Sequence, residues 1–137
     1  MCMMFEHQLI QATGFRNHGP VGARDGFEIR LRVPNYRGMR LSLLDGVDVT
    51  VDGEFFSHEV TRLILHGEIF DLAAMRAATT VRWAIEEPAS VLVLKPGGLT
   101  PGIHDLKVAA RVRSPYFPPQ LQPLPVHAHR KATVVLP

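Results

Sequence analysis

Hydrophobic and polar residues alternate along most of this chain, with the period of β-strands. In residues 26–33, apolar side chains take every second position and charged side chains take the positions between them. Residues 46–51 and 104–113 follow the same pattern, and residues 90–94 form a short, continuous apolar run. Successive side chains of a strand point to opposite faces of its sheet, so the pattern predicts strands with one buried face.

Turn residues separate the predicted strands. Asp52-Gly53 follows one apolar run and precedes another, which predicts a tight hairpin turn because both central positions of such a turn take positive φ. His66-Gly67 lies near the tip of a second predicted hairpin, within residues 61–70. These turns are too short for crossover connections, so they favour antiparallel pairing.

One segment favours a helix, residues 71–78, with Asp71 as its N-cap. Two helical turns are too few to organise a fold. We therefore expect an all-β protein of eight or nine short strands, an antiparallel β-sandwich with one short helix, as a single domain over residues 1–137. In the last predicted strand, the positions expected to face inward are Val126, Ala128, Val134 and Leu136.

A proline-rich segment interrupts the strands at residues 115–125, which hold five prolines. Proline has no N–H to donate to a strand ladder, so we expect an extended arm or loop here. The arm carries Tyr116 and Phe117, and large apolar side chains on an irregular arm must pack on their own sandwich or on a partner. We favour a partner.

The stretch "KPGGLTPG" at residues 95–102 precedes His104 and Asp105, which raises the question of a ligand loop beside a catalytic dyad. A phosphate-binding loop leads into a helix, whereas this one leads into a predicted strand. We interpret the glycines as turn residues, with Pro101-Gly102 at the centre of a type II turn. Adjacent side chains on a strand leave opposite faces, so the histidine and the aspartate cannot pair with each other.

Other candidate chemistry is incomplete. His127 and His129 lie two apart on a predicted strand and share a face, an arrangement that can bind a metal, but no third ligand lies near them in the sequence. Glu86 and Glu87 are neighbours, whereas glycosidase chemistry needs carboxyl groups on both sides of a sugar. We therefore expect no catalytic residue, metal ligand set or cofactor in this chain.

Composition and charge narrow the choice of partners. The chain has 137 residues, a formal charge of +2 and a pI near 9.0, with its basic residues scattered, so we expect no nucleic-acid partner. No apolar run reaches the roughly 18 residues of a membrane helix. The start of the chain has no secretory pattern, and Cys2 is the single cysteine. These features predict a cytoplasmic protein without a membrane partner.

Residues 34–44 are too irregular for a simple hairpin. Asn35 and Gly38 favour turns, and between them lie Tyr36 and Arg37, residue types common at binding hot spots. The sequence leaves open whether this is a plain surface loop or a recognition loop.

Several motifs, in order, resemble the small β subunit of bacterial C-glycoside deglycosidases. They are "GFRN", "NYRGMRLSLLDGVDVTVDGE", "VRWAIEEPASVLVLKPGGLTPGIHDLKV" and "RVRSPYFP", spread over residues 15–118. The resemblance implies a complex with a barrel-type α subunit that holds a divalent metal, expected to be manganese. Such complexes cleave the carbon–carbon bond between a 3-oxo-glucosyl group and an aromatic aglycone.

The resemblance gives this chain a supporting role at the rim of the partner's active site. The residues we expect at that rim are Asn35, Tyr36, Arg37, Gly38, Tyr116 and Phe117. The alternative is a stand-alone carbohydrate-binding β-sandwich, which would need exposed aromatic side chains to stack on sugars. Trp83 is one of its few candidates, and we expect Trp83 in the core.

Overall fold

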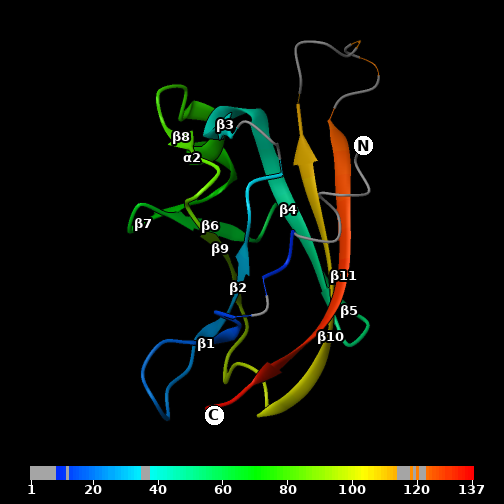
Figure 1. Cartoon of the computed structure of the whole chain (residues 1–137). Coiled ribbons are helices and arrows are strands. Elements are labelled where there is room, and N and C mark those ends of the chain that lie inside the picture. The colour runs from blue at the N-terminus through cyan, green and yellow to red at the C-terminus, as the bar shows by residue number, and fades with distance from the viewer. Residues whose placement is uncertain (1–8, 12, 35–37, 114–117, 119, 121–122) are drawn as a thin grey trace.

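The computed structural model describes residues 9–11, 13–34, 38–113, 118, 120 and 123–137. Two antiparallel sheets form its layers (Figure 1). The first has five strands, in the order β1 (Arg16–His18), β2 (Gly26–Leu31), β9 (Ala89–Leu94), β6 (Arg62–Leu65) and β7 (Glu68–Phe70). The second has four, in the order β11 (Leu124–Val134), β10 (Gly102–Val112), β4 (Leu44–Val51) and β5 (Glu54–Phe56).

Short elements complete the described part of the chain. β3 (Met39–Arg40) pairs with β8 (Arg82–Trp83), the 3-10 helix η1 spans Leu41–Leu43, and the helix α2 spans Leu72–Ala77. The predicted all-β, antiparallel fold with one short α-helix is confirmed.

The core lies between the inward faces of the two sheets. The predicted inward positions of residues 26–33 are almost fully buried, as are those of β4 and most of those of β10. Each fully buried Val, Leu, Ile or Phe side chain stabilises the fold by roughly 1.5–3 kcal/mol relative to exposure. The side chains that fix the two facing layers include Phe27, Ile29, Leu31, Val47, Val49, Leu106, Val108 and Ala110.

Both predicted hairpin turns are present. Asp52 and Gly53 have φ of 50° and 87°, and His66 and Gly67 have φ of 54° and 77°. Positive φ at both central positions gives the turn a twist that matches the flanking strands. The predicted N-cap is also confirmed, because an Asp71 carboxylate oxygen accepts a hydrogen bond from the Ala74 N–H at 2.8 Å.

The expected number of strands was too low. The described residues form eleven strands, and β1, β3 and β8 are only two or three residues long. A period-two pattern cannot be recognised over two or three residues. These short strands form because neighbouring parts of the fold hold their backbones in an extended conformation.

The last strand also differs from its prediction at both ends. β11 ends at Val134, and Leu136 is 69% exposed instead of facing the core. At the other end, Leu124 and Pro125 already belong to β11, although we placed them in the arm of residues 115–125. β11 is an edge strand, where a residue without an N–H is tolerated.

The glycine-rich stretch is a corner that leads into β10, as predicted, but its turn lies earlier than expected. The Gly98 N–H donates to the Lys95 carbonyl at 2.8 Å, so Pro96 and Gly97 form the centre of the turn. Gly97 has φ of 84°, which suits the third position of a type II turn. Pro101-Gly102 does not form the predicted type II turn, because Gly102 is already paired with Val134 in the sheet.

Candidate functional site

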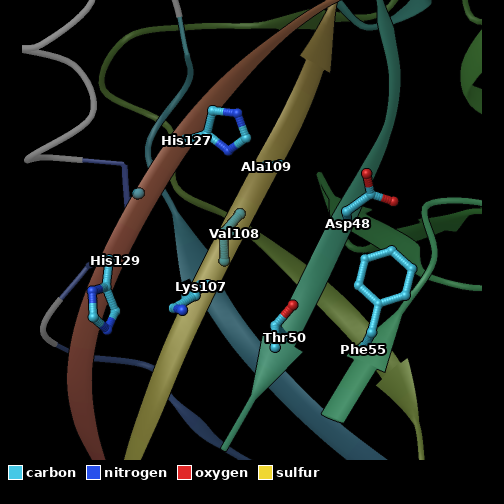
Figure 2. Close-up of a pocket in the computed structure, with 9 residues that line it drawn as sticks. Asp48, Thr50, Phe55, Lys107, Val108, Ala109, His127 and His129 are labelled. Carbon is cyan, nitrogen blue, oxygen red and sulfur yellow. The ribbon is translucent and has the colours of Figure 1, made fainter. Parts of the chain in front are cut away.

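A groove of about 540 Å³ lies on the outer face of the four-stranded sheet (Figure 2). It crosses all four strands, from β11 to β5. Val108 and Ala128 contribute to its floor, although their side chains are buried on the core side. The other lining residues are Asp48, Thr50, Phe55, Lys107, Ala109, His127 and His129.

The register of the sheet brings these side chains together. Lys107 of β10 lies opposite Thr50 on one side and His129 on the other. In the next outward-facing row, Ala109 lies opposite both Asp48 and His127. Alanine presents only a methyl group between the two longer side chains, so the surface is hollow at Ala109.

Two opposing walls border the hollow. Figure 2 shows His127 and His129 on β11 along one side, with Asp48 and Phe55 from β4 and β5 along the other. Phe55 is 63% exposed, whereas its neighbour Phe56 turns inward and packs edge-to-face on Phe27 at 5.8 Å between centroids. β5 therefore places one aromatic ring in the core and one at the rim of the groove.

Asp48 is held in a fixed orientation by His58. One Asp48 carboxylate oxygen accepts from the His58 backbone N–H at 2.6 Å and lies 2.9 Å from His58 Nδ1. Both side chains are largely screened from solvent. The segment after β5 packs closely here, since a Cβ on Gly46 would lie 2.7 Å from the His58 Cβ.

The predicted histidine pair shares one exposed face, as expected. His129 Nε2 lies 2.5 Å from an Asp105 carboxylate oxygen, and both groups are at the surface. Among the described residues, no group of three or more His, Cys, Asp or Glu side chains is arranged to hold a metal ion. Both histidines line the groove.

His104 and Asp105 do not pair with each other, and each finds a partner on another strand or turn. His104 faces inward, where Nδ1 lies 2.5 Å from an Asp52 carboxylate oxygen and Nε2 lies 2.7 Å from the Thr100 carbonyl. Burial disfavours the imidazolium, but the hydrogen bonds to Thr100 and Asp52 outweigh it and raise the pKa of His104 above its ordinary value.

A second ionic cluster joins the helix to the sheet. Asp45 of β4 is buried and accepts from Arg76 Nε at 2.7 Å, with Arg113 at 3.5 Å. The hydrogen bond from Arg76 is the main reason that the pKa of Asp45 is lowered. This cluster fixes α2 against β4, so its role is structural.

The predicted rim residues are only partly covered by the structure. Asn35, Tyr36, Arg37, Tyr116 and Phe117 lie outside the described residues. Gly38 is described: it is buried with φ of 76°, and a Cβ there would lie 2.8 Å from the Trp83 carbonyl.

The other sequence candidates have structural roles. Trp83 is fully buried, as predicted, and its indole N–H donates to the Glu87 carbonyl at 2.7 Å. The Glu87 carboxylate pairs with His66 near the tip of the second hairpin. In the part of the chain that the structure describes, no helix is long and apolar enough to cross a membrane.

Sequence reasoning found the histidines of the groove but missed Asp48, Phe55, Lys107 and Ala109. The alternation shows that Asp48, Lys107 and Ala109 face away from the core, so these three could have been collected as an outward-facing set. It does not decide which of the neighbours Phe55 and Phe56 faces outward. The meeting of the missed residues at one hollow depends on strand order and register, which the alternation does not give.

Two facing antiparallel layers with a groove on one outer face define a small all-β protein. A family model described as "C-glycoside deglycosidase beta subunit" matches residues 5–116. The chain belongs to this family, which confirms the resemblance found in its motifs, and it is thus a deglycosidase subunit.

Individual relatives agree with the family model. The C-glycoside deglycosidase beta subunit of Eubacterium cellulosolvens is 36% identical over 118 residues, which cover 85% of this chain and 80% of the relative. The 3'-dehydrocarminate deglycosidase beta subunit of a Microbacterium species is 31% identical over 105 residues, 76% of this chain and 78% of the relative.

Proposed function

We propose that this chain is the β subunit of a complex that cleaves the carbon–carbon glycosidic bond of 3-oxo-C-glucosides. Its partner is a barrel-type α subunit that holds a divalent metal, expected to be manganese. The observation that carries the proposal is the family match over residues 5–116, most of the chain.

The proposed reaction is an elimination. The 3-keto group acidifies the proton at C2, and a base removes that proton. The C1–aryl bond then breaks, its electron pair stays on the aryl carbon, and that carbon takes up a proton. The sugar retains a C1–C2 double bond. We place the base and the metal in the partner subunit.

This chain supports the catalyst by packing beside the mouth of the barrel, where barrel enzymes build their active sites. There it orders the partner's loops and helps to exclude water from the reaction. Its contribution comes from the rim residues Asn35, Tyr36 and Arg37, which the buried Gly38 follows, and from Tyr116 and Phe117 of the arm.

Reconstitution of the complex tests the proposal. The chain and a candidate α subunit are produced separately and together, and each preparation receives a 3-oxo-C-glucoside. We expect fixed-stoichiometry co-purification and release of the aglycone by the complex only. Release by this chain alone, or an α subunit that works equally well without it, would contradict the proposal.

A double variant tests the supporting role. Tyr36→Ala with Arg37→Ala should leave the complex less active, while Lys131→Ala, an exposed residue of β11 outside the groove, should not. Normal assembly and turnover of the double variant would exclude these two residues from the rim.

A further inference from the structure

We propose that the groove on the four-stranded sheet binds the sugar ring of a neutral glycoside, with Phe55 against one face of the ring. This inference goes beyond the proposed function, which places bond cleavage in the partner subunit. It gives this chain a ligand site of its own, built from residues other than those predicted at the rim.

The groove has an exposed aromatic ring at its rim, that of Phe55. Phe55 lies at the rim of the groove, and 63% of its surface is exposed. A phenylalanine in this position does not contribute the stabilisation that a buried phenylalanine would give. The face of a sugar ring presents C–H groups, which suit a flat aromatic surface. A Phe ring beside a hollow therefore provides an apolar platform for a sugar.

The polar lining matches the chemistry of sugar hydroxyl groups, which both donate and accept hydrogen bonds. The Asp48 carboxylate accepts, Lys107 donates, and the Thr50 hydroxyl does both. His127 and His129 add ring nitrogens that serve either way. A ligand with hydroxyl groups around one ring can use this mixed set, whereas a purely apolar ligand would leave it unsatisfied.

The site is already organised without a ligand. His58 holds the Asp48 carboxylate from two directions, at 2.6 and 2.9 Å, so this acceptor does not have to be ordered on binding. The other side chains stand on paired strands and not on loops. Preorganised groups lower the entropy cost of binding.

Charge and size favour a neutral, small ligand over an anion. The Lys107 ammonium faces a groove that also contains the Asp48 carboxylate, and Asp105 lies beside His129. A phosphate would gain from the lysine but would be repelled by these carboxylates. The volume of about 540 Å³ falls within the roughly 300–1,000 Å³ of small-molecule sites.

Nuclear magnetic resonance titration of the full-length chain tests the inference. The probe is methyl β-glucoside, and phenol and inorganic phosphate are titrated in separate samples. We expect saturable shifts of the Phe55, His127 and His129 side-chain signals with the glucoside, and none with the other two compounds. Loss of one aromatic contact in Phe55→Ala should weaken glucoside binding roughly tenfold.

A groove-filling variant gives the sharper comparison. Ala109→Leu places a larger side chain in the hollow and should weaken binding at least as much as Phe55→Ala. Lys131→Ala, on the same strand face as His129 but outside the groove, should bind as the parent chain does. Should Ala109→Leu fail to fold, the glucoside affinity of Phe55→Ala still tests the inference, because Phe55 is exposed and its loss should not prevent folding.

Several outcomes would overturn the inference. They are an absence of saturable glucoside shifts, binding of phosphate or phenol at the same residues, or full affinity in both Phe55→Ala and Ala109→Leu. Deglycosidase activity of the complex is measured separately, so failure of the groove to bind a glucoside would not contradict the proposed function.

Discussion

The buried imidazole of His104 lies 2.5 Å from the carboxylate of Asp52, a residue at the tip of the hairpin between β4 and β5. The second ring nitrogen lies 2.7 Å from the Thr100 carbonyl. Both neighbours are acceptors, and the imidazolium form of His104 can donate to both of them at once, which favours that form and raises the pKa of His104. The pair ties the start of β10 to the hairpin turn beside it.

Removal of this histidine should destabilise the protein more than neutralisation of its partner. We expect His104→Ala to lower the free energy of unfolding by about 2–3 kcal/mol, because two hydrogen bonds of a charged group are lost. Asp52→Asn keeps an acceptor and a residue that tolerates positive φ, so its cost should be about 1 kcal/mol. Urea denaturation measures both, and equal costs would contradict a charge-assisted pair.

Stability should fall as the pH rises above neutrality. The folded-state pKa of His104 is raised above the unfolded value of 6.5, so the stabilisation is fully present below pH 6.5. It is lost as the pH rises through the folded-state pKa. Urea midpoints measured across this window should decline in the parent chain, and His104→Gln should remove that part of the decline. A parallel decline in both proteins would exclude His104 as the source.

Two neighbouring glycines should respond differently to alanine. A Cβ on Gly97 meets nothing within 4 Å, so Gly97→Ala carries only the cost of positive φ, about 1–2 kcal/mol. A Cβ on Gly98 would lie 2.4 Å from the Asn17 side-chain oxygen. That side chain accepts from the Leu99 N–H at 2.7 Å and donates to the Leu99 carbonyl at 2.8 Å.

Because Asn17 would have to move, Gly98→Ala should cost more than Gly97→Ala, about 3 kcal/mol or above, by strain together with lost hydrogen bonds. Thermal unfolding of the two variants gives the comparison. Equal melting temperatures would show that Asn17 does not hold this corner.

The Asp45 carboxylate should stabilise the contact between α2 and β4. Asp45→Asn should cost about 1–3 kcal/mol, because a buried hydrogen bond to a charged group is weakened. The hydrogen bond from Arg76 lowers the pKa of Asp45, so its contribution is present above the unfolded value of 3.8 and is lost as the pH falls through the folded-state pKa.

Glu59→Gln is a suitable control for this prediction, since Glu59 is exposed near Arg76 and should change stability by less than about 0.5 kcal/mol. Denaturant unfolding at neutral and acid pH distinguishes the two variants. A cost for Asp45→Asn that is the same at both pH values would contradict an ionic contribution.

The sequence by itself determined the longer strands, which of their faces are buried and where the two hairpins turn. Those properties are local: side chains alternate with a fixed period, and positive φ restricts the residues that a tight turn accepts. The N-cap at Asp71 and the burial of Trp83 were also predicted from the local sequence. The motifs also indicated the family.

Only the tertiary structure decided which outward-facing residues meet. Ala109 lies between Asp48 and His127 because β10 pairs with both β4 and β11 in one register. A shift of β10 by one residue would turn Ala109 to the other face of the sheet, away from both. The partners of His104 and Asp105 depend on the same pairing. Strand order and register arise from the packing of the whole core, so no single segment contains them.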